Sequence, residues 1–476
     1  MTPHILLIDL PTFPKGTVSL SLPYLASILS NRYSIKLIDL NFEPENTAVE
    51  FAISNQPIMV GLKVSSQNHH IAQKISILLK TTCPSTKIVW GGEYPTLLPD
   101  QCLQYTHTIV KGLFDSVAEE FLKDLGARTL QQVYEGGNKT LPESWSAPNW
   151  DLIGDLKRYN QFMGLPLETT RGCTESCTFC MVLIMQRKHY HKRPLTAIAN
   201  EVAAIGHNFI NIIDYNFGVD REHVVGVCNI IQQSKALGFM AEMTIELLDD
   251  EEVLKALCAA RCKMVYCGLE TIDEIALKSV GKDRTNHIEN YRRIIRKAQK
   301  AGVNVASGFI LGMEHSTLDS YRNTVAFFKE MGIMYAKFTF LTFNPGTRSQ
   351  MFYRKKGRFI TEDPKHYDGN HLTFLPEGVS AEDTYNGTRW FIGNFYSFRS
   401  IISRSMKVPM PLHHRLSFVL FNLCYREVYL TWLKEDALQE NWNSDVLLER
   451  VYQKGWKLKF AETSLILLWK GQRAIA

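Results

Sequence analysis

Apolar residues occur in short runs along the first 125 residues of the chain, and longer amphipathic segments separate these runs. This alternation is typical of a parallel α/β sheet, in which a helix leads from each strand to the next. We therefore expect an α/β fold that begins with an open, doubly wound, Rossmann-like sheet, whose ligands bind beyond the carboxyl ends of the strands. The expected strands are residues 4–10, 34–40, 58–64, 87–91 and 108–111, and the expected helices are residues 21–30, 68–82 and 116–125.

A second alternation begins at Leu165, after a polar stretch that contains glycines and prolines. Its six strand–helix units occupy about 180 residues and predict a partial (β/α)6 barrel, because a closed barrel of this type has eight units. The expected strands are residues 165–170, 209–214, 239–245, 264–269, 303–311 and 336–343. The last part of the chain has an amphipathic helical pattern and no further strand–helix unit, so we expect it to be mainly helical.

These patterns divide the chain into four parts. A length of 476 residues agrees with such a division, because single hydrophobic cores stop growing beyond about 250–300 residues. We expect a Rossmann-like domain over residues 1–126, a linker over 127–163, a partial barrel over 164–347 and a C-terminal accessory region over 348–476.

Composition and charge narrow the class of protein. With 45% hydrophobic and 21% charged residues, the chain has the composition of a folded globular protein. The net charge of +5 is small for this length, so we expect no nucleic-acid partner. The amino terminus lacks the basic segment of a signal peptide, and no apolar run reaches the ~18 residues of a membrane span. We therefore expect a cytoplasmic protein.

Three of the ten cysteines are clustered directly after the first expected barrel strand: Cys173, Cys177 and Cys180. Three thiolates in one loop can bind three irons of a [4Fe-4S] cluster and leave the fourth iron free to bind a small molecule. A zinc site that adds His189 or His191 is one alternative, although structural zinc ligands usually occur as two separated pairs. Unliganded cysteines are the other alternative.

The remaining cysteines are scattered, which is not the pattern of a disulfide framework. Cys258, Cys262 and Cys267 are close in sequence and could indicate a second metal site. The first two share a helical face, whereas Cys267 falls in an expected strand. We interpret all three as small buried hydrophobic residues.

The spacing Cys-x3-Cys-x2-Cys, with Phe179 before the last cysteine, resembles the cluster motif of the radical S-adenosylmethionine (radical SAM) superfamily. The resemblance implies that SAM chelates the open iron through its amino and carboxylate groups, and that Phe179 lies against the adenine. One electron from the reduced cluster then cleaves SAM to a 5′-deoxyadenosyl radical. A flavodoxin- or ferredoxin-type protein would supply that electron.

Residues 308–314, Gly-Phe-Ile-Leu-Gly-Met-Glu, resemble the fifth-strand motif of the same superfamily. The resemblance implies that Gly308, Gly312 and Glu314 form part of the SAM site beside the adenine. Taken alone, the two glycines could simply permit close packing of a strand against a helix.

Polar residues also end the second and fourth barrel strands, where the superfamily places further SAM contacts. The resemblance implies that Asp214 and Asn216 lie near the methionine amino group, and that Glu270 lies near the ribose or the methionine. An acidic residue just past a strand could instead cap the next helix.

The N-terminal domain resembles the cobalamin-binding domain that precedes the barrel in class B radical SAM proteins. The resemblance rests on the sheet pattern, on Ser65 and Ser66 after the third strand, and on Gly91 and Gly92 after the fourth. It implies that these four residues contact cobalamin, because glycines let the corrin approach the backbone. A purely structural domain without cobalamin is the alternative.

Two departures qualify this resemblance. The Asp-x-His-x-x-Gly signature of cobalamin-ligating domains is absent, and residues 39–44 stand in the corresponding place, so we expect no histidine ligand to cobalt. Residues 112–115, Gly-Leu-Phe-Asp, also depart from the usual Gly-Glu-Gly-Glu. The methylthiolating branch is disfavoured, because it needs a second cysteine triplet and this domain offers only Cys83 and Cys102.

The last third of the chain resembles the C-terminal region of relatives that act on hopanoids, chlorophyll precursors and other apolar metabolites. The resemblance rests on residues 344–347 and 394–397. Nearby aromatic residues could line an apolar pocket or belong to the core: Trp390, Phe391, Phe395, Tyr396 and Phe398. Basic residues over 399–407 could form a solvated face or contact an anionic membrane surface.

We therefore expect a cobalamin-dependent radical SAM enzyme that methylates an unactivated carbon of a small or lipid-like metabolite. In this chemistry one SAM supplies the methyl group by way of cobalamin and a second supplies the radical, so no protein nucleophile is expected. Cyclisation, ring contraction or carbon–carbon coupling without methyl transfer is the alternative. A non-catalytic cobalamin or redox sensor is disfavoured, because a sensor has no need of SAM motifs around an open iron.

Overall fold

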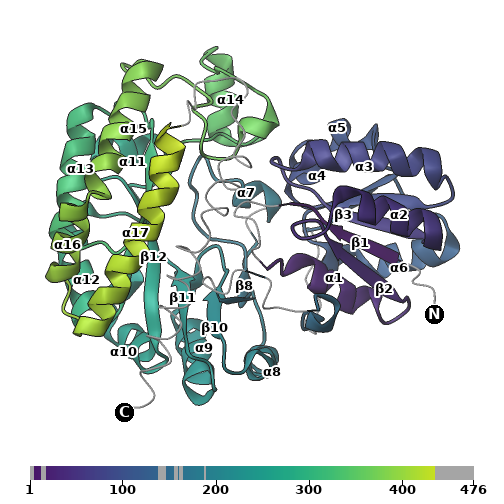
Figure 1. Ribbon diagram of the computed structural model, residues 1–476, viewed down its shortest axis with the longest axis horizontal. Helices are drawn as coiled ribbons and strands as arrows, with labels where there is room; N and C mark the ends of the chain where they lie inside the picture. The colour runs from purple at the N-terminus through teal and green to yellow at the C-terminus, as the bar shows by residue number, and fades with distance from the viewer. Residues whose placement is uncertain are drawn as a thin grey trace.

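The computed structural model describes residues 5–11, 18–137, 146–154, 159, 164–186 and 189–434. Figure 1 shows two α/β units side by side, with the C-terminal helices packed on the larger one. The expected fold class is thereby confirmed. Residues 1–4, which bear on the signal-peptide expectation, and residues 435–476 of the C-terminal region lie outside the described residues.

The N-terminal sheet has six parallel strands in the order β2-β1-β3-β4-β5-β6. Helices α1 and α6 pack on one face and helices α2 and α3 on the other, so each face has its own apolar core. The strands are β1 (Ile5–Asp9), β2 (Ile35–Asp39), β3 (Met59–Lys63), β4 (Lys87–Gly91), β5 (Thr108–Lys111) and β6 (Val133–Glu135). The helices are α1 (Ser21–Leu29), α2 (Glu45–Asn55), α3 (His69–Thr82), α4 (Glu93–Leu97), α5 (Pro99–Leu103) and α6 (Ala118–Ala127), with the short turn η1 (Phe114–Val117) before α6.

Strand β6 corrects the expected linker, because the sequence pattern placed its residues between the domains. The strand is only three residues long and buries Tyr134 alone, so it leaves no periodic signal in the sequence. Helix α2 was also not expected. It buries only Ala48 and Ala52, and small residues give a weak amphipathic pattern.

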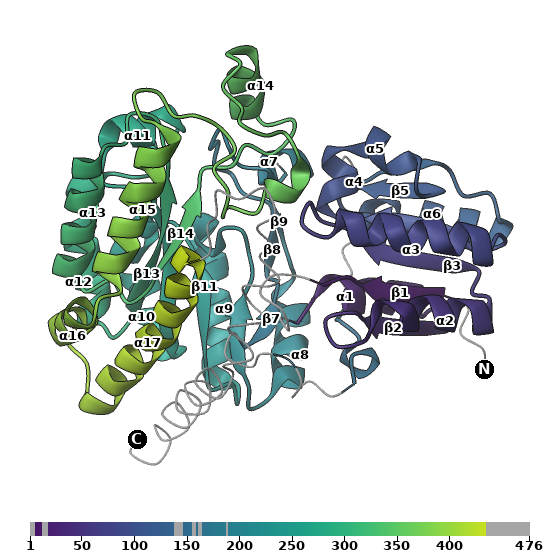
Figure 2. The same ribbon diagram turned by 45° about the horizontal axis from the view of Figure 1, so that its top comes forward.

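The second sheet also has six parallel strands, in the sequential order β7-β10-β11-β12-β13-β14 from one edge to the other. Helices cover its outer face and the sheet curls into a partial barrel, as Figure 2 shows. The strands are β7 (Leu165–Leu167), β10 (Phe209–Ile212), β11 (Gly238–Glu242), β12 (Cys262–Glu270), β13 (Asn304–Leu311) and β14 (Ala336–Phe340). The covering helices are α8 (Leu195–Ile205), α9 (Arg221–Gln233), α10 (Glu251–Ala259), α12 (Ile288–Lys300) and α13 (Leu318–Met331), and α11 (Glu274–Ser279) follows β12.

The C-terminal region is helical, as expected, and packs on the barrel. Phe391 of α15 stacks on Phe309 of β13 with ring centroids 4.4 Å apart. Tyr429 of α17 accepts a hydrogen bond at 3.2 Å from the backbone N–H of Phe338, which covers part of the open edge of β14. The described helices of this region are α14 (Arg348–Lys355), α15 (Ala381–Phe395), α16 (Phe398–Lys407) and α17 (Leu412–Lys434).

Most of the aromatic residues of this region belong to the core. Phe391, Phe395 and Tyr396 are buried, whereas Trp390 is only partly buried and Phe398 is exposed. Core packing therefore accounts for the first three, and the pocket alternative has no support from them. None of the described helices is long and apolar enough to cross a membrane.

Cys262 and Cys267 are likewise buried in the barrel core, and Cys258 packs against it. The thiol of Cys258 donates a hydrogen bond at 2.9 Å to the carbonyl oxygen of Ala301. These contacts agree with our interpretation of the three as packing residues.

Candidate active site between the two α/β units

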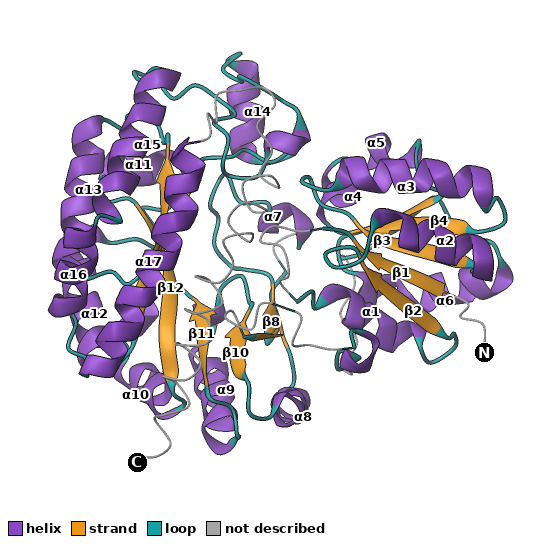
Figure 3. Ribbon diagram, viewed as in Figure 1, coloured by secondary structure: helices purple, strands orange, loops and turns teal. Residues whose placement is uncertain are grey.

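The cysteine loop lies between the two sheets, next to α7 (Val182–Met185), as Figure 3 shows. It leaves the short strand β8 (Thr170–Arg171) and returns through β9 (His191–Lys192), which pairs with β8. The two ends of the loop approach closely at Gly172. Its φ is +92°, and a Cβ there would lie 1.8 Å from the carbonyl oxygen of His189. Only glycine fits this position.

The three cysteine thiols are partly exposed and lie within electrostatic range of one another. Burial raises the pKa of the Cys177 thiol to about 12, the ammonium of Lys282 opposes this shift, and Cys180 and Cys173 add to it. Among the described residues, no three His, Cys, Asp or Glu side chains are arranged to hold a single metal ion. Three thiols on one loop can each bind one iron of a [4Fe-4S] cluster, and this ligand set stays a prediction.

The cysteine loop contacts the strand that carries the expected adenine motif. Phe179 packs against a buried cluster that includes Ile310 and Met313. The backbone N–H of Thr178 donates a hydrogen bond at 3.1 Å to the carbonyl oxygen of Val280, just after α11. The loop thus reaches the carboxyl edge of the barrel sheet, and the contact of Phe179 with adenine stays a prediction.

Glu270 ends β12 in a left-handed conformation with φ of +61°. Its carboxylate forms a largely buried ion pair with Lys282 at 2.6 Å. Gly268 and Gly308 make room for this carboxylate, because a Cβ would lie 2.6 Å from Oε1 and 3.0 Å from Oε2, respectively. The next helix is capped by Asp273, so the helix-cap alternative for Glu270 is wrong. Strained residues of this kind are concentrated at functional sites.

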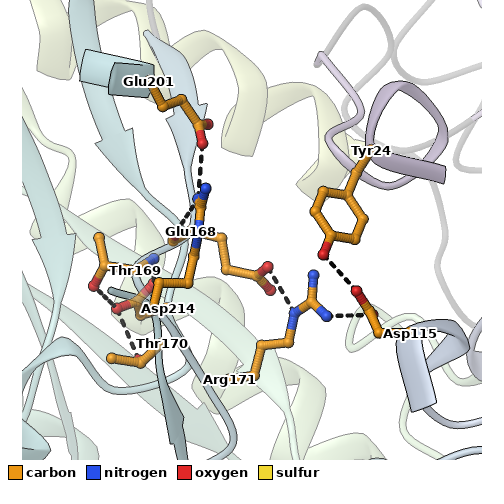
Figure 4. Close-up of polar contacts among 9 residues, drawn as sticks. Tyr24, Asp115, Glu168, Thr169, Thr170, Arg171, Glu201 and Asp214 are labelled. Atoms are coloured by element: carbon orange, nitrogen blue, oxygen red, sulfur yellow. Dashed lines mark hydrogen bonds and ion pairs between the residues drawn. The ribbon is translucent and has the colours of Figure 1, made fainter. Parts of the chain in front are cut away.

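Asp214 lies just past β10, and its carboxylate is fully engaged. Oδ1 accepts a hydrogen bond at 2.6 Å from the backbone N–H of Thr169, and Oδ2 accepts bonds from the hydroxyls of Thr169 and Thr170 at 2.5 and 2.8 Å (Figure 4). Burial raises the pKa of Asp214 to about 6. The cap alternative is wrong here too, because Asn216 caps the following turn. Asp214 thus holds the segment that leads into the cysteine loop, and its contact with SAM stays a prediction.

The next two residues face the cysteines. The side chain of Asn216 hydrogen-bonds the thiol of Cys173 and also accepts a bond at 3.2 Å from the backbone N–H of Thr244. Tyr215 lies within electrostatic range of Cys180 in the barrel and of Glu93 in the N-terminal unit, yet it is 45% exposed. Sequence analysis did not single out Tyr215. The signal was available, since a large aromatic residue directly follows a buried strand.

Glu314 and Gly312 lie after β13. The Glu314 carboxylate pairs with Arg358 at 2.9 Å and accepts a hydrogen bond at 2.5 Å from the backbone N–H of Glu377. Both partners belong to the C-terminal region, so Glu314 ties that region to the barrel, which the family resemblance did not predict. Gly312 has φ of +69°, and its N–H donates a hydrogen bond at 3.1 Å to the hydroxyl of Tyr321.

The residues expected to contact cobalamin lie at the carboxyl ends of β3 and β4. The hydroxyl of Ser66, next to Ser65, donates a hydrogen bond at 2.8 Å to the carboxylate of Glu93. A Cβ on Gly91 would meet no atom within 4 Å, whereas one on Gly92, where φ is +107°, would lie 2.8 Å from a backbone oxygen. Gly91 thus has open space beside it, and Gly92 is required by the turn.

The segment in place of the histidine signature contacts the linker instead. Asp39 accepts hydrogen bonds from the side chain of Asn41 at 2.7 Å and from the hydroxyl of Tyr159 at 2.6 Å. Phe42 packs edge-on against the ring of Tyr159, 4.8 Å between centroids. This segment supplies contacts to the linker and no histidine.

The two units are in direct contact beside the cysteine loop. Helix α4 of the N-terminal unit contacts α7 of the cysteine loop. A Cβ on Gly112, after β5, would lie 3.4 Å from the carbonyl oxygen of Met185 at the end of α7. The carboxyl edge of the N-terminal sheet therefore adjoins the cysteine loop.

A buried ionic contact also joins the units, as Figure 4 shows. Arg171, two residues before Cys173, donates from Nη1 to Asp115 of the N-terminal unit at 2.5 Å and from Nε to Glu168 at 2.7 Å. Its guanidinium lies 4.8 Å from the ring centroid of Tyr24, whose hydroxyl donates to Asp115. Sequence analysis missed this contact, although Asp115 keeps an acidic residue at the last place of the altered Gly-Glu-Gly-Glu stretch.

Comparisons with known proteins agree with this arrangement. The B12 binding domain family matches residues 11–122, and the Radical SAM superfamily matches residues 167–328. The chain is 22% identical to bacteriochlorophyllide d C-8(2)-methyltransferase of Chlorobaculum tepidum, over 86% of this chain and 92% of the relative. It is 22% identical to the hopanoid C-2 methylase of Rhodopseudomonas palustris, over 73% of this chain and 66% of the relative.

A solved structure shares the fold. The radical SAM methyltransferase TsrM of Kitasatospora setae, with cobalamin and a [4Fe-4S] cluster bound, superposes with a TM-score of 0.66 at 15% identity, over 96% of this chain and all of that one. The described site, the two domain matches and this fold lead to one conclusion. The chain carries a B12 binding domain followed by a radical SAM domain and is an enzyme whose cofactors are a [4Fe-4S] cluster, SAM and cobalamin.

Proposed function

We propose that this enzyme transfers a methyl group from SAM to an unactivated carbon of a small, largely apolar metabolite. The observation that carries the proposal is the contact between helix α4 of the N-terminal unit and helix α7 of the cysteine loop. The exposed Tyr215 lies within electrostatic range of both Cys180 and Glu93 of the N-terminal unit. Residues of both cofactor-binding units therefore border the same accessible place. When bound, the cluster supplies the electron that cleaves SAM, and cobalamin supplies the carrier for the methyl group.

Each unit contributes its own residues to this proposal. Cys173, Cys177 and Cys180 hold the cluster, and Asn216 orients the first of these thiols. SAM lies along the carboxyl edge of the barrel, where we assign it Phe179, Gly308, Gly312 and the Glu270–Lys282 pair. Cobalamin lies at the carboxyl edge of the N-terminal sheet, against Ser65, Ser66, Gly91 and Gly92.

The inner face of the barrel offers two charged side chains to a polar group of the substrate. Alternate strand residues such as Phe239, Ala241 and Phe338 belong to the core under the helices, so their neighbours Glu242 and Lys337 point the other way. Burial raises the pKa of Glu242, and Lys337 opposes the shift, which places the two charges near each other. By their names, two relatives methylate a bacteriochlorophyllide and a hopanoid.

Two finer proposals concern partners. A flavodoxin- or ferredoxin-type protein delivers the electron that the cluster needs. Helix α16 contacts an anionic membrane surface, because Phe398, Ile402 and Met406 form an exposed stripe on a helix that also carries the basic residues Arg399 and Lys407. Flotation with vesicles that contain anionic lipid tests this contact, and equal recovery with neutral vesicles would contradict it.

The methyl-transfer proposal is tested with anaerobically reconstituted enzyme, titanium(III) citrate and SAM that carries a deuterated methyl group. Bacteriochlorophyllide d and a hopanoid serve as probes, and mass spectrometry follows the label. We expect label in a probe and none with Cys177→Ala, while Cys102→Ala, at a buried cysteine outside the site, behaves as wild type. Formation of 5′-deoxyadenosine together with an altered but unlabelled probe would favour the ring-forming alternative.

A further inference from the structure

The ionic contact between the two units lies next to both proposed cofactor sites. Asp115 lies in η1, directly after the loop that begins at Gly112 at the carboxyl edge of the N-terminal sheet. Arg171 lies at the end of β8, directly before Gly172 and the cysteines. The contact therefore links the loop after β5 to the start of the cysteine loop.

The contact is rigid on both sides. The side chains of Arg171 and Asp115 are only 7% and 9% exposed. Glu168 fixes the guanidinium at Nε, and the hydroxyl of Tyr24 donates to the second carboxylate oxygen of Asp115. Arginine suits this role because its planar group forms several hydrogen bonds in one fixed geometry.

The segment that carries Arg171 is itself anchored to the barrel. Asp214 binds Thr169 and Thr170, as described above, and Arg193 donates from Nη1 to the carbonyl oxygen of Glu168 at 2.7 Å. Arg193 also forms a buried ion pair with Glu201 of α8 at 2.7 Å. A shift of Asp115 would therefore not be absorbed by movement of Arg171.

We propose that Asp115 and Arg171 are positioning residues. They fix the carboxyl edge of the N-terminal sheet relative to the cysteine loop, so that the methyl group of SAM is held in reach of cobalamin. The inference rests on the proposed function. Cleavage of SAM by the cluster uses barrel residues alone, so it does not depend on this contact. Methyl transfer from SAM depends on both units, and displacements of about 1 Å are enough to slow such steps about 100-fold.

The test compares Asp115→Asn with Glu45→Gln, which makes the same carboxylate-to-amide change in the exposed pair with Lys74. In reduced holoenzyme given SAM alone, S-adenosylhomocysteine reports methyl transfer and 5′-deoxyadenosine reports cleavage. We expect Asp115→Asn to lower the rate of S-adenosylhomocysteine formation about tenfold or more. Bound iron, bound cobalt and 5′-deoxyadenosine should stay within about twofold of wild type, and Glu45→Gln should change neither rate.

A second measurement uses the cofactor-free protein. Hydrogen–deuterium exchange in Asp115→Asn should increase over residues 112–117 and 168–173 and stay unchanged over α3. Unchanged exchange together with an unchanged ratio of the two products would overturn the proposal. A proportional fall of both products would also overturn it, because it would indicate a general structural role.

If Asp115→Asn does not fold, Asp115→Glu decides, since it keeps the charge and moves the carboxylate. A lowered ratio of S-adenosylhomocysteine to 5′-deoxyadenosine in that variant supports the positioning role, and a wild-type ratio contradicts it. Wild-type enzyme that forms no S-adenosylhomocysteine would instead refute the proposed function. The exchange data alone would then judge the contact.

Discussion

The carboxyl edges of the two sheets carry the two cofactor sites, but their polar residues are held in different ways. At the barrel edge, Asp214, Glu270 and Glu314 each have hydrogen-bonding or ionic partners on neighbouring segments. At the carboxyl edge of the N-terminal sheet, Oδ1 of the buried Asp9 has no hydrogen-bond partner among the described residues, and Gly91 faces open space. The comparison agrees with our proposal of a preorganised polar site for SAM at the barrel edge and of a cobalamin site beside Gly91.

The largest expected effect comes from opening the cysteine loop at the barrel edge. Gly172→Ala should abolish iron binding and 5′-deoxyadenosine formation, because the new Cβ would collide with the carbonyl oxygen of His189 in a backbone conformation that favours glycine. Iron analysis after anaerobic reconstitution measures the effect. Gly393→Ala is the matched control, since a Cβ there meets nothing within 4 Å. Wild-type iron content in Gly172→Ala would contradict the loop geometry.

A smaller effect should separate the two edges from each other. Gly91→Leu fills the open space at the end of β4 and should weaken cobalamin binding about tenfold, the equivalent of about 1.4 kcal/mol, while bound iron stays unchanged. Titration of the iron-loaded protein with hydroxocobalamin measures this affinity. An unchanged affinity would place cobalamin away from Gly91.

The smallest expected effect concerns stability and pH. Burial raises the pKa of Asp9 from 3.8 to about 6, so between these values the folded state holds a proton that the unfolded state has lost. The free energy of unfolding should therefore fall as pH rises through this window, by about 2 to 3 kcal/mol, and stay lowered above it. Asp9→Asn should remove this fall.

Urea unfolding of wild type and Asp9→Asn at pH 4 and pH 7 checks the sign. The stability of Asp9→Asn relative to wild type should be greater at the higher pH. A relative stability that does not change with pH would show that burial of the Asp9 carboxylate carries no such cost.

The sequence predicted the elements that carry strong periodic patterns. Strands β3, β12 and β13 are long or mostly apolar, and each was predicted to within two residues at either end. Strand β6 was missed because a three-residue edge strand buries one side chain. Helix α2 was missed because its core contacts are two alanines.

Local motifs predicted the cysteine loop and the strand-end residues but not their partners. Asp214 and Glu314 were expected to contact SAM, which stays a prediction. The sequence did not predict that their carboxylates also bind Thr169 and Thr170 or the C-terminal region. The contact between Asp115 and Arg171 joins residues 56 positions apart in different units. No periodic pattern records such a pair, since only the docking of the two units brings the residues together.

The most direct test of the account is metal and product analysis of the enzyme reconstituted anaerobically with iron, sulfide and hydroxocobalamin. We predict about four irons and one cobalt per chain, and reductant-dependent formation of both 5′-deoxyadenosine and S-adenosylhomocysteine from SAM. Iron and 5′-deoxyadenosine without bound cobalt or S-adenosylhomocysteine would contradict cobalamin-dependent methyl transfer and leave a radical enzyme of the ring-forming or coupling kind.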